Sequence, residues 1–120
     1  MSEHDEQVAL FQWAEYNLIH HPELWLLHAI PNGGHRHAAV GKRLKAEGVK
    51  AGVPDMFLPV ARGEYHGLYI EMKYGKNKTT DAQREWLNRL AAEGYLTAVC
   101  WGWTEASERI EWYLTEVETS

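Results

Sequence analysis

The segments 53–60 and 68–73 restrict most strongly what this chain can fold into. Both are rich in apolar and aromatic side chains, and a connection of hairpin length that contains Gly63 lies between them. The pattern predicts two neighbouring antiparallel strands. Thr80 and Gln83 follow with the spacing of a capping box, so a helix is expected after the strand pair. A strand pair that leads into a helix indicates a sheet with helices packed on it.

The rest of the chain contributes further helices and strands. Ser2 suits the N-cap of a first helix at 3–20, and Pro22 is expected to end it. The predicted apolar face of this helix consists of Val8, Phe11, Leu18 and Ile19. The other expected elements are a buried strand at 25–30, a short basic helix at 38–47, a helix from 81 to about 93, a strand at 95–101 and a helix from 105 to about 117. This order predicts the α/β class, with helices flanking a small mixed sheet.

Length and composition favour one domain over residues 1–120. Cys100 is the only cysteine, which excludes an intramolecular disulfide or a Cys-rich zinc site and suits a reducing compartment. The longest apolar run, residues 24–27, is far shorter than the roughly 20 residues of a membrane span. The first twenty residues contain acids but no Lys or Arg, unlike a secretion signal. We therefore expect a cytoplasmic protein that does not contact a membrane.

The formal net charge of -5 hides a segregation of charge along the chain. Residues 1–31 contain five acids and no Lys or Arg, and residues 91–120 contain six acids against Arg109 alone. Most of the basic side chains lie between residues 36 and 89. Because exposed charges are screened beyond about 8 Å at physiological salt, a basic middle can bind phosphates while the acidic ends face elsewhere. A solvated helix face is the alternative explanation.

Asp55 and Glu71 are expected at the same end of the predicted strand pair, because one begins its strand and the other ends the next. Side chains two apart on a strand share a face, which places Lys73 beside Glu71 and turns Met72 the other way. Two carboxylates suit Mg²⁺ or Mn²⁺, with the main-chain carbonyl of Met72 as a further ligand. Such an ion activates water beside a scissile phosphate, which Lys73 would help to stabilise. The alternative is an acid and a Glu–Lys pair on a solvated sheet edge.

Four motifs stand in order along the chain: HAIPNGG at 28–34, GVKAGVPD at 48–55, YIEMK at 69–73 and QREW at 83–86. Together they resemble the virus-type replication-repair nuclease (VRR-NUC) family of the PD-(D/E)XK nuclease superfamily, over nearly the whole chain. The resemblance implies a restriction-endonuclease-like αβββαβ core and metal-dependent cleavage of DNA. Members that act as isolated small domains look like structure-specific nucleases that recognise branched DNA, including four-way junctions.

The resemblance also implies roles for single residues. Asp55 and Glu71 match the family's metal ligands, Lys73 matches its catalytic lysine, and Gln83 matches the glutamine that follows the core hairpin near the site. Together these four form the predicted catalytic set.

The family tends to supply a third acid from the first helix, and Glu3, Glu6 and Glu15 compete for this place. Glu3 is our choice as a metal ligand, because its distance from Gln7 fits the family's spacing of Glu and Gln best. The alternative for these acids is solvation or interaction with a helix N-terminus.

The residues expected to bind nucleic acid lie mainly around the turn at 31–34. Asn32 and the backbone amides of this turn can hydrogen-bond a phosphate, although a simple turn is an equal explanation. A transition-metal site at His35 and His37 is disfavoured because no Cys or ligand-spaced helix accompanies them. The predicted phosphate contacts are Asn32, His35, Arg36, Lys42, Lys45 and Lys76.

Trp101 and Trp103 flank a glycine at the end of a predicted strand. An exposed ring there would serve as a base-stacking platform or a dimer contact. A four-way junction is two-fold symmetric, so a homodimer would suit it.

The sequence thus predicts a Mg²⁺- or Mn²⁺-dependent DNA endonuclease that favours branched DNA such as four-way (Holliday) junctions and acts as a homodimer. Two alternatives remain open. One is a flap or restriction-like nuclease with the same site, and the other is a nucleic-acid-binding module whose metal site is unused.

Overall fold

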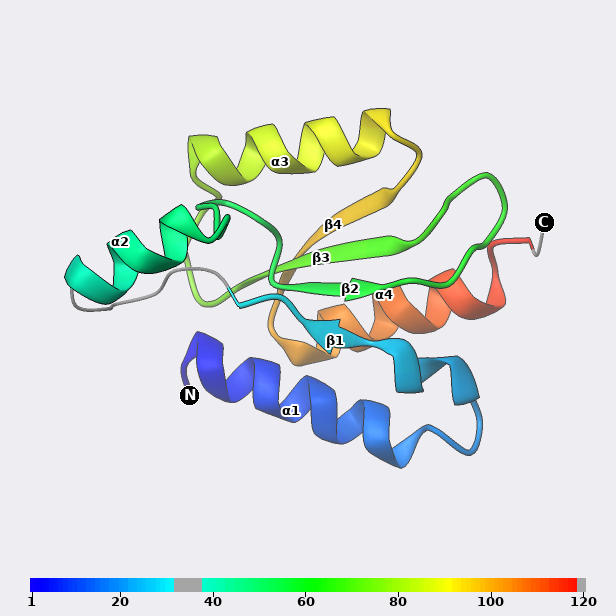
Figure 1. The fold of residues 1–120 in the computed structure, drawn as a ribbon. Coiled ribbons are helices and arrows are strands. Elements are labelled where there is room, and N and C mark those ends of the chain that lie inside the picture. The colour runs from blue at the N-terminus through cyan, green and yellow to red at the C-terminus, as the bar shows by residue number, and fades with distance from the viewer. Residues whose placement is uncertain (32–37, 119–120) are drawn as a thin grey trace.

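One mixed sheet organises the described part of the chain (Figure 1). The structure is a computed structural model and describes residues 1–31 and 38–118. The strands follow one another across the sheet in the order β1 (His28–Ala29), β2 (Met56–Leu58), β3 (Leu68–Lys73) and β4 (Leu96–Trp101). The first three pair in antiparallel fashion, whereas β3 and β4 are parallel. A parallel pair needs a crossover, and α3 (Asp81–Ala92) supplies it.

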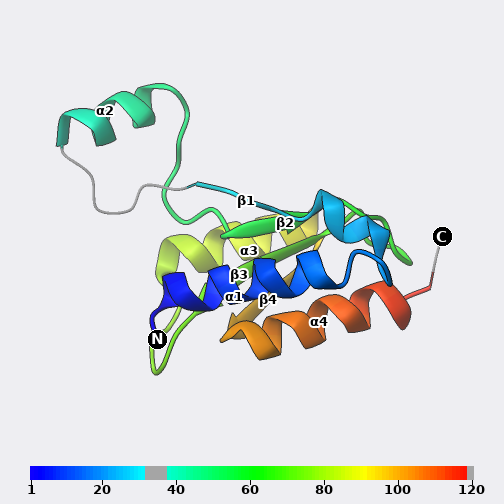
Figure 2. The same cartoon turned by 90° about the horizontal axis from the view of Figure 1, so that it is seen from below.

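The helices lie on both sides of this sheet. The others in the described residues are α1 (Glu3–Tyr16), the 3-10 helix η1 (Pro22–Leu26), α2 (Ala38–Ala46) and α4 (Trp103–Thr115). In Figure 1, α1 and α4 lie below the sheet and α3 lies above it. Figure 2 shows that α2 stands away from the rest of the fold. This arrangement confirms the predicted α/β class and order of elements. None of the described helices combines the length and apolarity that crossing a membrane requires.

Side chains along β2 and β3 point alternately to the two faces of the sheet, and these two faces differ in chemistry. The pairs Met56–Ile70 and Leu58–Leu68 stand directly opposite each other, and all four side chains are fully buried. They belong to one core with residues of α1 and α4. Because successive side chains on a strand point to opposite faces, the intervening positions of these strands face α3. The candidate catalytic residues of β3 occupy such positions, so they are built outside the main core.

The first helix ends earlier than predicted and buries a different side. It stops at Tyr16 rather than at residue 20. Its buried residues are Leu10 and Ala14, because α4 packs against this side. Val8 and Ile19, which were assigned to the apolar face, are 43% and 84% exposed, and the other two members of that face are only partly buried. The prediction of this face was therefore wrong.

The predicted buried strand at 25–30 is also wrong for most of its length. Pro22 does not simply end the first helix but opens η1, where its missing N–H is no loss. Leu24 and Leu27 are buried while Trp25 is 78% exposed. A spacing of three matches the three residues per turn of a 3-10 helix, so the apolar run is divided between core and solvent.

The remaining elements match the predictions with small shifts. Strand β3 has the predicted bounds, and β2 is shorter than 53–60 because Pro54 and Pro59 cannot donate to a sheet ladder. Helix α4 begins at Trp103, two residues earlier than expected. The capping box of α3 is complete, with Thr80 as N-cap.

Tyr113 of α4 makes a buried hydrogen bond whose contribution to the stability of the core can be measured. Its side chain is fully buried, and its hydroxyl donates a hydrogen bond to the Val60 carbonyl oxygen at 2.6 Å. Tyr113→Phe leaves that carbonyl without its donor, so we expect the free energy of unfolding to fall by about 1–3 kcal/mol in urea denaturation. Tyr65→Phe is the control, because its hydroxyl has no partner within residues 1–31 and 38–118. An equal loss in both variants would contradict this explanation.

Candidate metal centre

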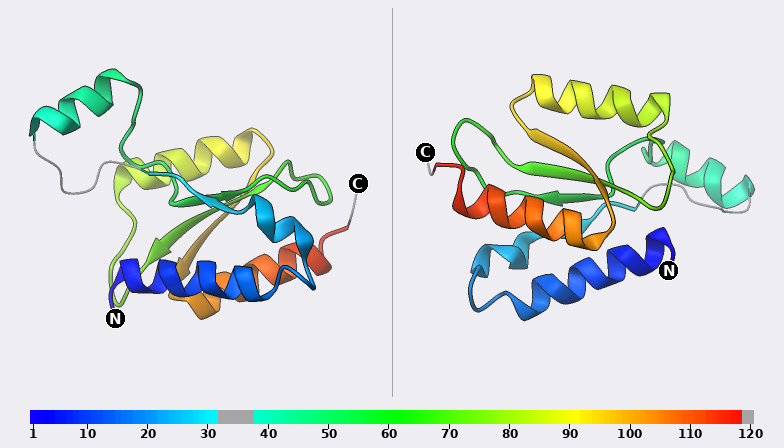
Figure 3. Two further views of the ribbon diagram at one scale, coloured as in Figure 1. Left: turned by 60° about the horizontal axis from the view of Figure 1, so that its bottom comes forward. Right: turned by 180° about the vertical axis from the view of Figure 1, so that it is seen from behind.

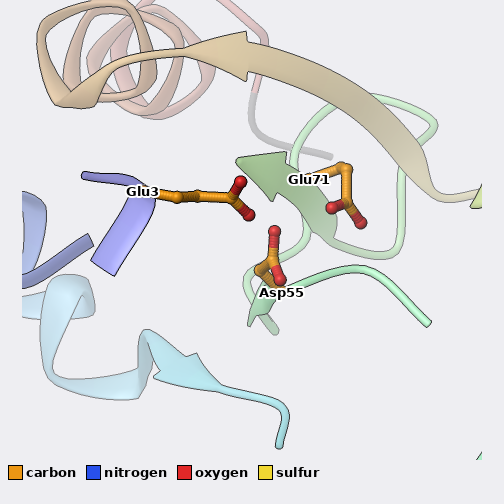
Figure 4. A group of neighbouring side chains, drawn as sticks. All are labelled: Glu3, Asp55 and Glu71. Carbon is orange, nitrogen blue, oxygen red and sulfur yellow. The ribbon is translucent and has the colours of Figure 1, made fainter. Parts of the chain in front are cut away.

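Three carboxylates meet at one end of the sheet. Glu3 is the first residue of α1, Asp55 directly precedes β2, and Glu71 lies in β3. One oxygen of each side chain lies within 4.8 Å of the corresponding oxygens of the other two. Figure 4 shows the three side chains reaching from these separate segments toward one space. The structure thus brings both predicted strand acids together and joins Glu3 to them.

The register of β2 and β3 explains why the two strand acids meet. Asp55 is one position before Met56, which pairs with Ile70, so Asp55 stands opposite Glu71 on the same face of the sheet. The Asp55 carbonyl oxygen accepts from the Ile30 N–H at 2.7 Å. Its carboxylate Oδ2 accepts from the Met72 N–H at 2.6 Å. Both ends of this residue are therefore fixed by neighbouring backbone.

Gln83 holds the second acid. Its side-chain Nε2 donates to Glu71 Oε2 at 3.2 Å, and its Oε1 accepts from the Thr80 N–H at 2.9 Å. The Thr80 hydroxyl in turn accepts from the Gln83 N–H at 3.2 Å. The capping box that starts α3 therefore also orients a carboxylate of the site. The sequence identified Thr80 only as a helix cap, and its support of the site was missed, although the capping-box spacing close behind β3 carried the signal.

Lys73 places a cation beside these acids. Its Nζ lies 4.0 Å from Glu71 Oε2, and the two side chains are only 8% and 2% exposed. Since a buried charge is costly unless it is paired, this contact ties the lysine to the acidic cluster. The structure therefore brings the ammonium group of Lys73 and three carboxylates together at one end of β3.

Electrostatic repulsion makes this cluster unfavourable without a counter-ion. Burial, the close approach of the Asp55 carboxyl group and the charge of Glu3 raise the pKa of Glu71 to about 9, and Lys73 only partly opposes them. Burial and the charge of Asp55 also raise the pKa of Glu3. Like charges that share a site favour a bound proton or a bound cation.

One oxygen of this cluster is buried and lacks a partner in the described part of the chain. Glu71 Oε1 is inaccessible to solvent, and no hydrogen-bond donor from the described residues reaches it. Buried carboxylate oxygens are normally hydrogen-bonded or bound to a metal ion. Three converging carboxylates with one unpartnered buried oxygen therefore fit a divalent cation, for which Glu3, Asp55 and Glu71 are the available ligands.

The other two N-terminal acids lie elsewhere. Glu6 Oε1 accepts from the Trp103 N–H at 3.4 Å, so this carboxylate faces the N-terminus of α4, where it interacts favourably with the helix dipole. Glu15 is exposed on α1, outside the acidic cluster. The structure therefore favours Glu3 over its two competitors by position.

Met72 contributes a donor and a core side chain. Its N–H holds Asp55, and its side chain is fully buried on the opposite face. The role of its carbonyl oxygen as a metal ligand stays a prediction.

Three of the predicted phosphate contacts are exposed near this end of the molecule. Lys42 and Lys45 lie on α2, and Lys76 lies in the loop between β3 and α3. Figure 3 shows α2 on the side of the fold where α1 begins. The predicted contacts Asn32, His35 and Arg36, together with the turn at 32–34 and His37, fall outside the described residues.

The raised pKa of Glu71 predicts that metal binding releases protons. A carboxylate must be ionised to bind a cation, and the raised pKa of this group favours its protonated form in the metal-free protein. Mn²⁺ binding should therefore release about one proton per ion, and its affinity should rise as pH increases toward 9. Calorimetric titration in two buffers of different ionisation enthalpy measures the release.

Glu71→Gln should bind Mn²⁺ weakly and release almost no protons. Glu15→Gln, outside the cluster, should behave like the unchanged protein. A binding enthalpy that does not depend on the buffer would contradict the proton linkage.

Comparison with known proteins identifies the family of this fold and site. The family model of the VRR-NUC domain matches residues 2–103 of this chain. No curated protein sequence matches the chain significantly. A solved structure described as a VRR_NUC domain protein is 33% identical, with 100% of this chain and 93% of that chain covered and a TM-score of 0.84. The chain therefore belongs to the VRR-NUC domain family, a family of nuclease-type domains.

Proposed function

We propose that this protein is a metal-dependent DNA endonuclease that hydrolyses phosphodiester bonds in branched DNA, four-way junctions above all, and that residues 1–120 act as one nuclease domain. The convergence of Glu3, Asp55 and Glu71 beside Lys73 carries the proposal. The arrangement of Pro54-Asp55 and Glu71-Met72-Lys73 on adjacent strands also supports placement in the PD-(D/E)XK superfamily.

The donor set favours Mg²⁺ or Mn²⁺ as the metal. All three candidate ligands are carboxylates, and hard oxygen donors are preferred by these ions. Among residues 1–31 and 38–118, no His or Cys joins the cluster, and these are the usual ligands of zinc. When bound, the ion would lower the pKa of a coordinated water and neutralise charge on the scissile phosphate.

The chain's own residues would divide the remaining work. Glu3 from the start of α1, Asp55 from the residue before β2 and Glu71 from β3 would hold the ion. Gln83 keeps the Glu71 carboxylate in one orientation through the hydrogen bond to Oε2. Lys73, at the end of the same strand, positions the attacking water or stabilises the negative charge that develops on the phosphate. Hydrolysis forms a bond from the water oxygen to phosphorus and breaks the bond to the leaving oxygen, which takes up a proton.

The distribution of charge supports DNA as the substrate. The exposed lysines of α2 and of the loop after β3 lie at the end of the fold that holds the acidic cluster. Helix α4, in contrast, carries three exposed acids: Glu105, Glu108 and Glu111. Phosphates would therefore be drawn to one end of the molecule, by backbone charge rather than by base edges.

Branched DNA and a homodimer form one part of the proposal. A four-way junction has two-fold symmetry, so a two-fold dimer would present two sites to it. The exposed apolar side chains Tyr16, Ile19 and Trp25, which are 84%, 84% and 78% exposed, support self-association at the end of α1, in the turn after it and in η1.

Cleavage assays on matched substrates test the function. A labelled four-way junction, a flap and an intact duplex are incubated with Mg²⁺, Mn²⁺ or EDTA. We expect metal-dependent products, with the junction cut fastest, and Asp55→Asn should slow cleavage by at least about 100-fold because a metal ligand is lost. Glu15→Gln is the matched control and should retain full activity.

Different outcomes would point to different functions. If the flap or the duplex is cut faster than the junction, that DNA rather than the junction is the preferred substrate. Binding without products under all metal conditions would indicate a nucleic-acid-binding module. Equal activity of Asp55→Asn and the unchanged protein would refute the proposed site.

Lys73→Met tests the role of the lysine separately from DNA binding. The substitution keeps the buried stem but removes the charge, so kcat should fall about 100- to 1,000-fold while DNA affinity changes little. Lys42→Met on α2 should have the opposite effect, a weaker affinity with unchanged cleavage of bound DNA. Single-turnover cleavage and anisotropy titrations measure both quantities. Unchanged turnover of Lys73→Met would remove this residue from the mechanism.

A further inference from the structure

Trp101 lies beside the lysine of the candidate site. It is the last residue of β4 and pairs with Lys73 in the parallel register, so their backbones are about 4.8 Å apart. The Gly102 N–H donates to the Lys73 carbonyl oxygen at 3.1 Å, which ties the ends of the two strands together. Paired residues of adjacent strands have their side chains on the same face, so Trp101 is on the face that carries Glu71 and Lys73.

The indole of Trp101 is held in place but remains accessible. Its Nε1–H donates to the Asn77 carbonyl oxygen at 2.8 Å, across the loop that joins β3 to α3. That loop is itself turned back, because the Asn77 N–H donates to the Tyr74 carbonyl oxygen at 3.2 Å. Trp101 is nevertheless 41% exposed, in contrast to Trp103, which packs against the core. A large aromatic side chain that is fixed by its N–H and open to solvent is prepared to stack on another flat group.

The surroundings of this ring favour a nucleotide as that group. Lys76 and Lys78 are exposed on the same loop, and neither forms an ion pair with a carboxylate of residues 1–31 or 38–118. Aromatic side chains combined with unpaired cations are typical of surfaces that bind single-stranded nucleic acid. An apolar protein partner is disfavoured, because these lysines would have to be desolvated against it.

We propose that Trp101 is a specificity-determining residue that stacks on an unpaired base next to the scissile phosphate, with Lys76 and Lys78 contacting the flanking phosphates. This inference rests on the proposed nuclease function and adds that the site selects DNA with an unpaired base beside the scissile phosphate. In an intact duplex every base face is already stacked on its neighbours. At a branch point or fork a base is easily unstacked, so the indole stabilises branched substrates selectively.

Fluorescence of 2-aminopurine tests stacking without requiring cleavage. The base analogue is placed as the first unpaired base of a forked DNA, once in each arm, and Asp55→Asn protein is added in EDTA. Stacking on the indole should quench the fluorescence with one arm. Trp101→Phe in the same background should keep the quenching, because it retains a stacking ring and loses only the N–H, whereas Trp101→Leu should lose it.

Trp112 provides a matched control. It is 40% exposed on α4, beside Arg109 and away from the site, so Trp112→Leu should leave the quenching unchanged.

With active protein, Trp101→Leu should lower kcat/KM for forked DNA about 5- to 100-fold, which is the range that loss of one base–aromatic stack gives, and should change duplex cleavage far less. Thermal unfolding of each variant checks that the fold is retained.

The outcomes separate this inference from the function on which it rests. Quenching that survives Trp101→Leu, or is never seen with either arm, would overturn the stacking role even if the protein cuts DNA. Loss of quenching in Trp101→Phe as well would show that only the bond to Asn77 matters, and would also overturn it. If unchanged protein cuts no DNA with any metal, the nuclease proposal itself fails, whatever the fluorescence shows.

Discussion

The antiparallel pairing of β2 and β3 is the constraint on which the candidate site depends. It sets Met56 against Ile70 in the core, and by the same register it sets Asp55 against Glu71 on the other face. Two carboxylates are thereby held together although their charges repel. The stability of the core, in which both Met56 and Ile70 are fully buried, offsets this repulsion. A cation that binds between the acids would relieve it, so folding prepares a binding site that the unfolded chain lacks.

Elements distant in the sequence complete the site from three sides. The N-terminus of α1 brings Glu3, the start of α3 brings Gln83, and the end of β4 brings Trp101 beside Lys73. Each is positioned by ordinary helix or strand contacts rather than by a dedicated loop, which favours a rigid site. In the same layout, α4 carries the exposed acids Glu105, Glu108 and Glu111, while exposed lysines lie on α2 and in the loop after β3. A chain of net negative charge can in this way still offer a basic surface to phosphates.

The sequence predicted the elements with strong local signals and failed where tertiary packing decides. The capping box at Thr80 and the bounds of β3 were correct because cap chemistry and a short apolar run specify them locally. The apolar run at 24–27 misled, since its pattern does not show that only Leu24 and Leu27 face the core. Within the site, the meeting of Asp55 and Glu71 followed from strand geometry. The position of Glu3 depends on how α1 packs, and spacing alone could only suggest it. The support that Gln83 receives from Thr80 also needed coordinates.

The proposed function requires Glu3, Asp55 and Glu71 to bind one divalent cation together. Anomalous diffraction from crystals soaked in Mn²⁺ tests it most directly, because the ion is located without reference to activity. We expect one strong anomalous peak within about 2.0–2.6 Å of an oxygen of each of the three side chains. A peak that lies elsewhere, or a site that stays empty at saturating Mn²⁺ while the three carboxylates keep their positions, would contradict it.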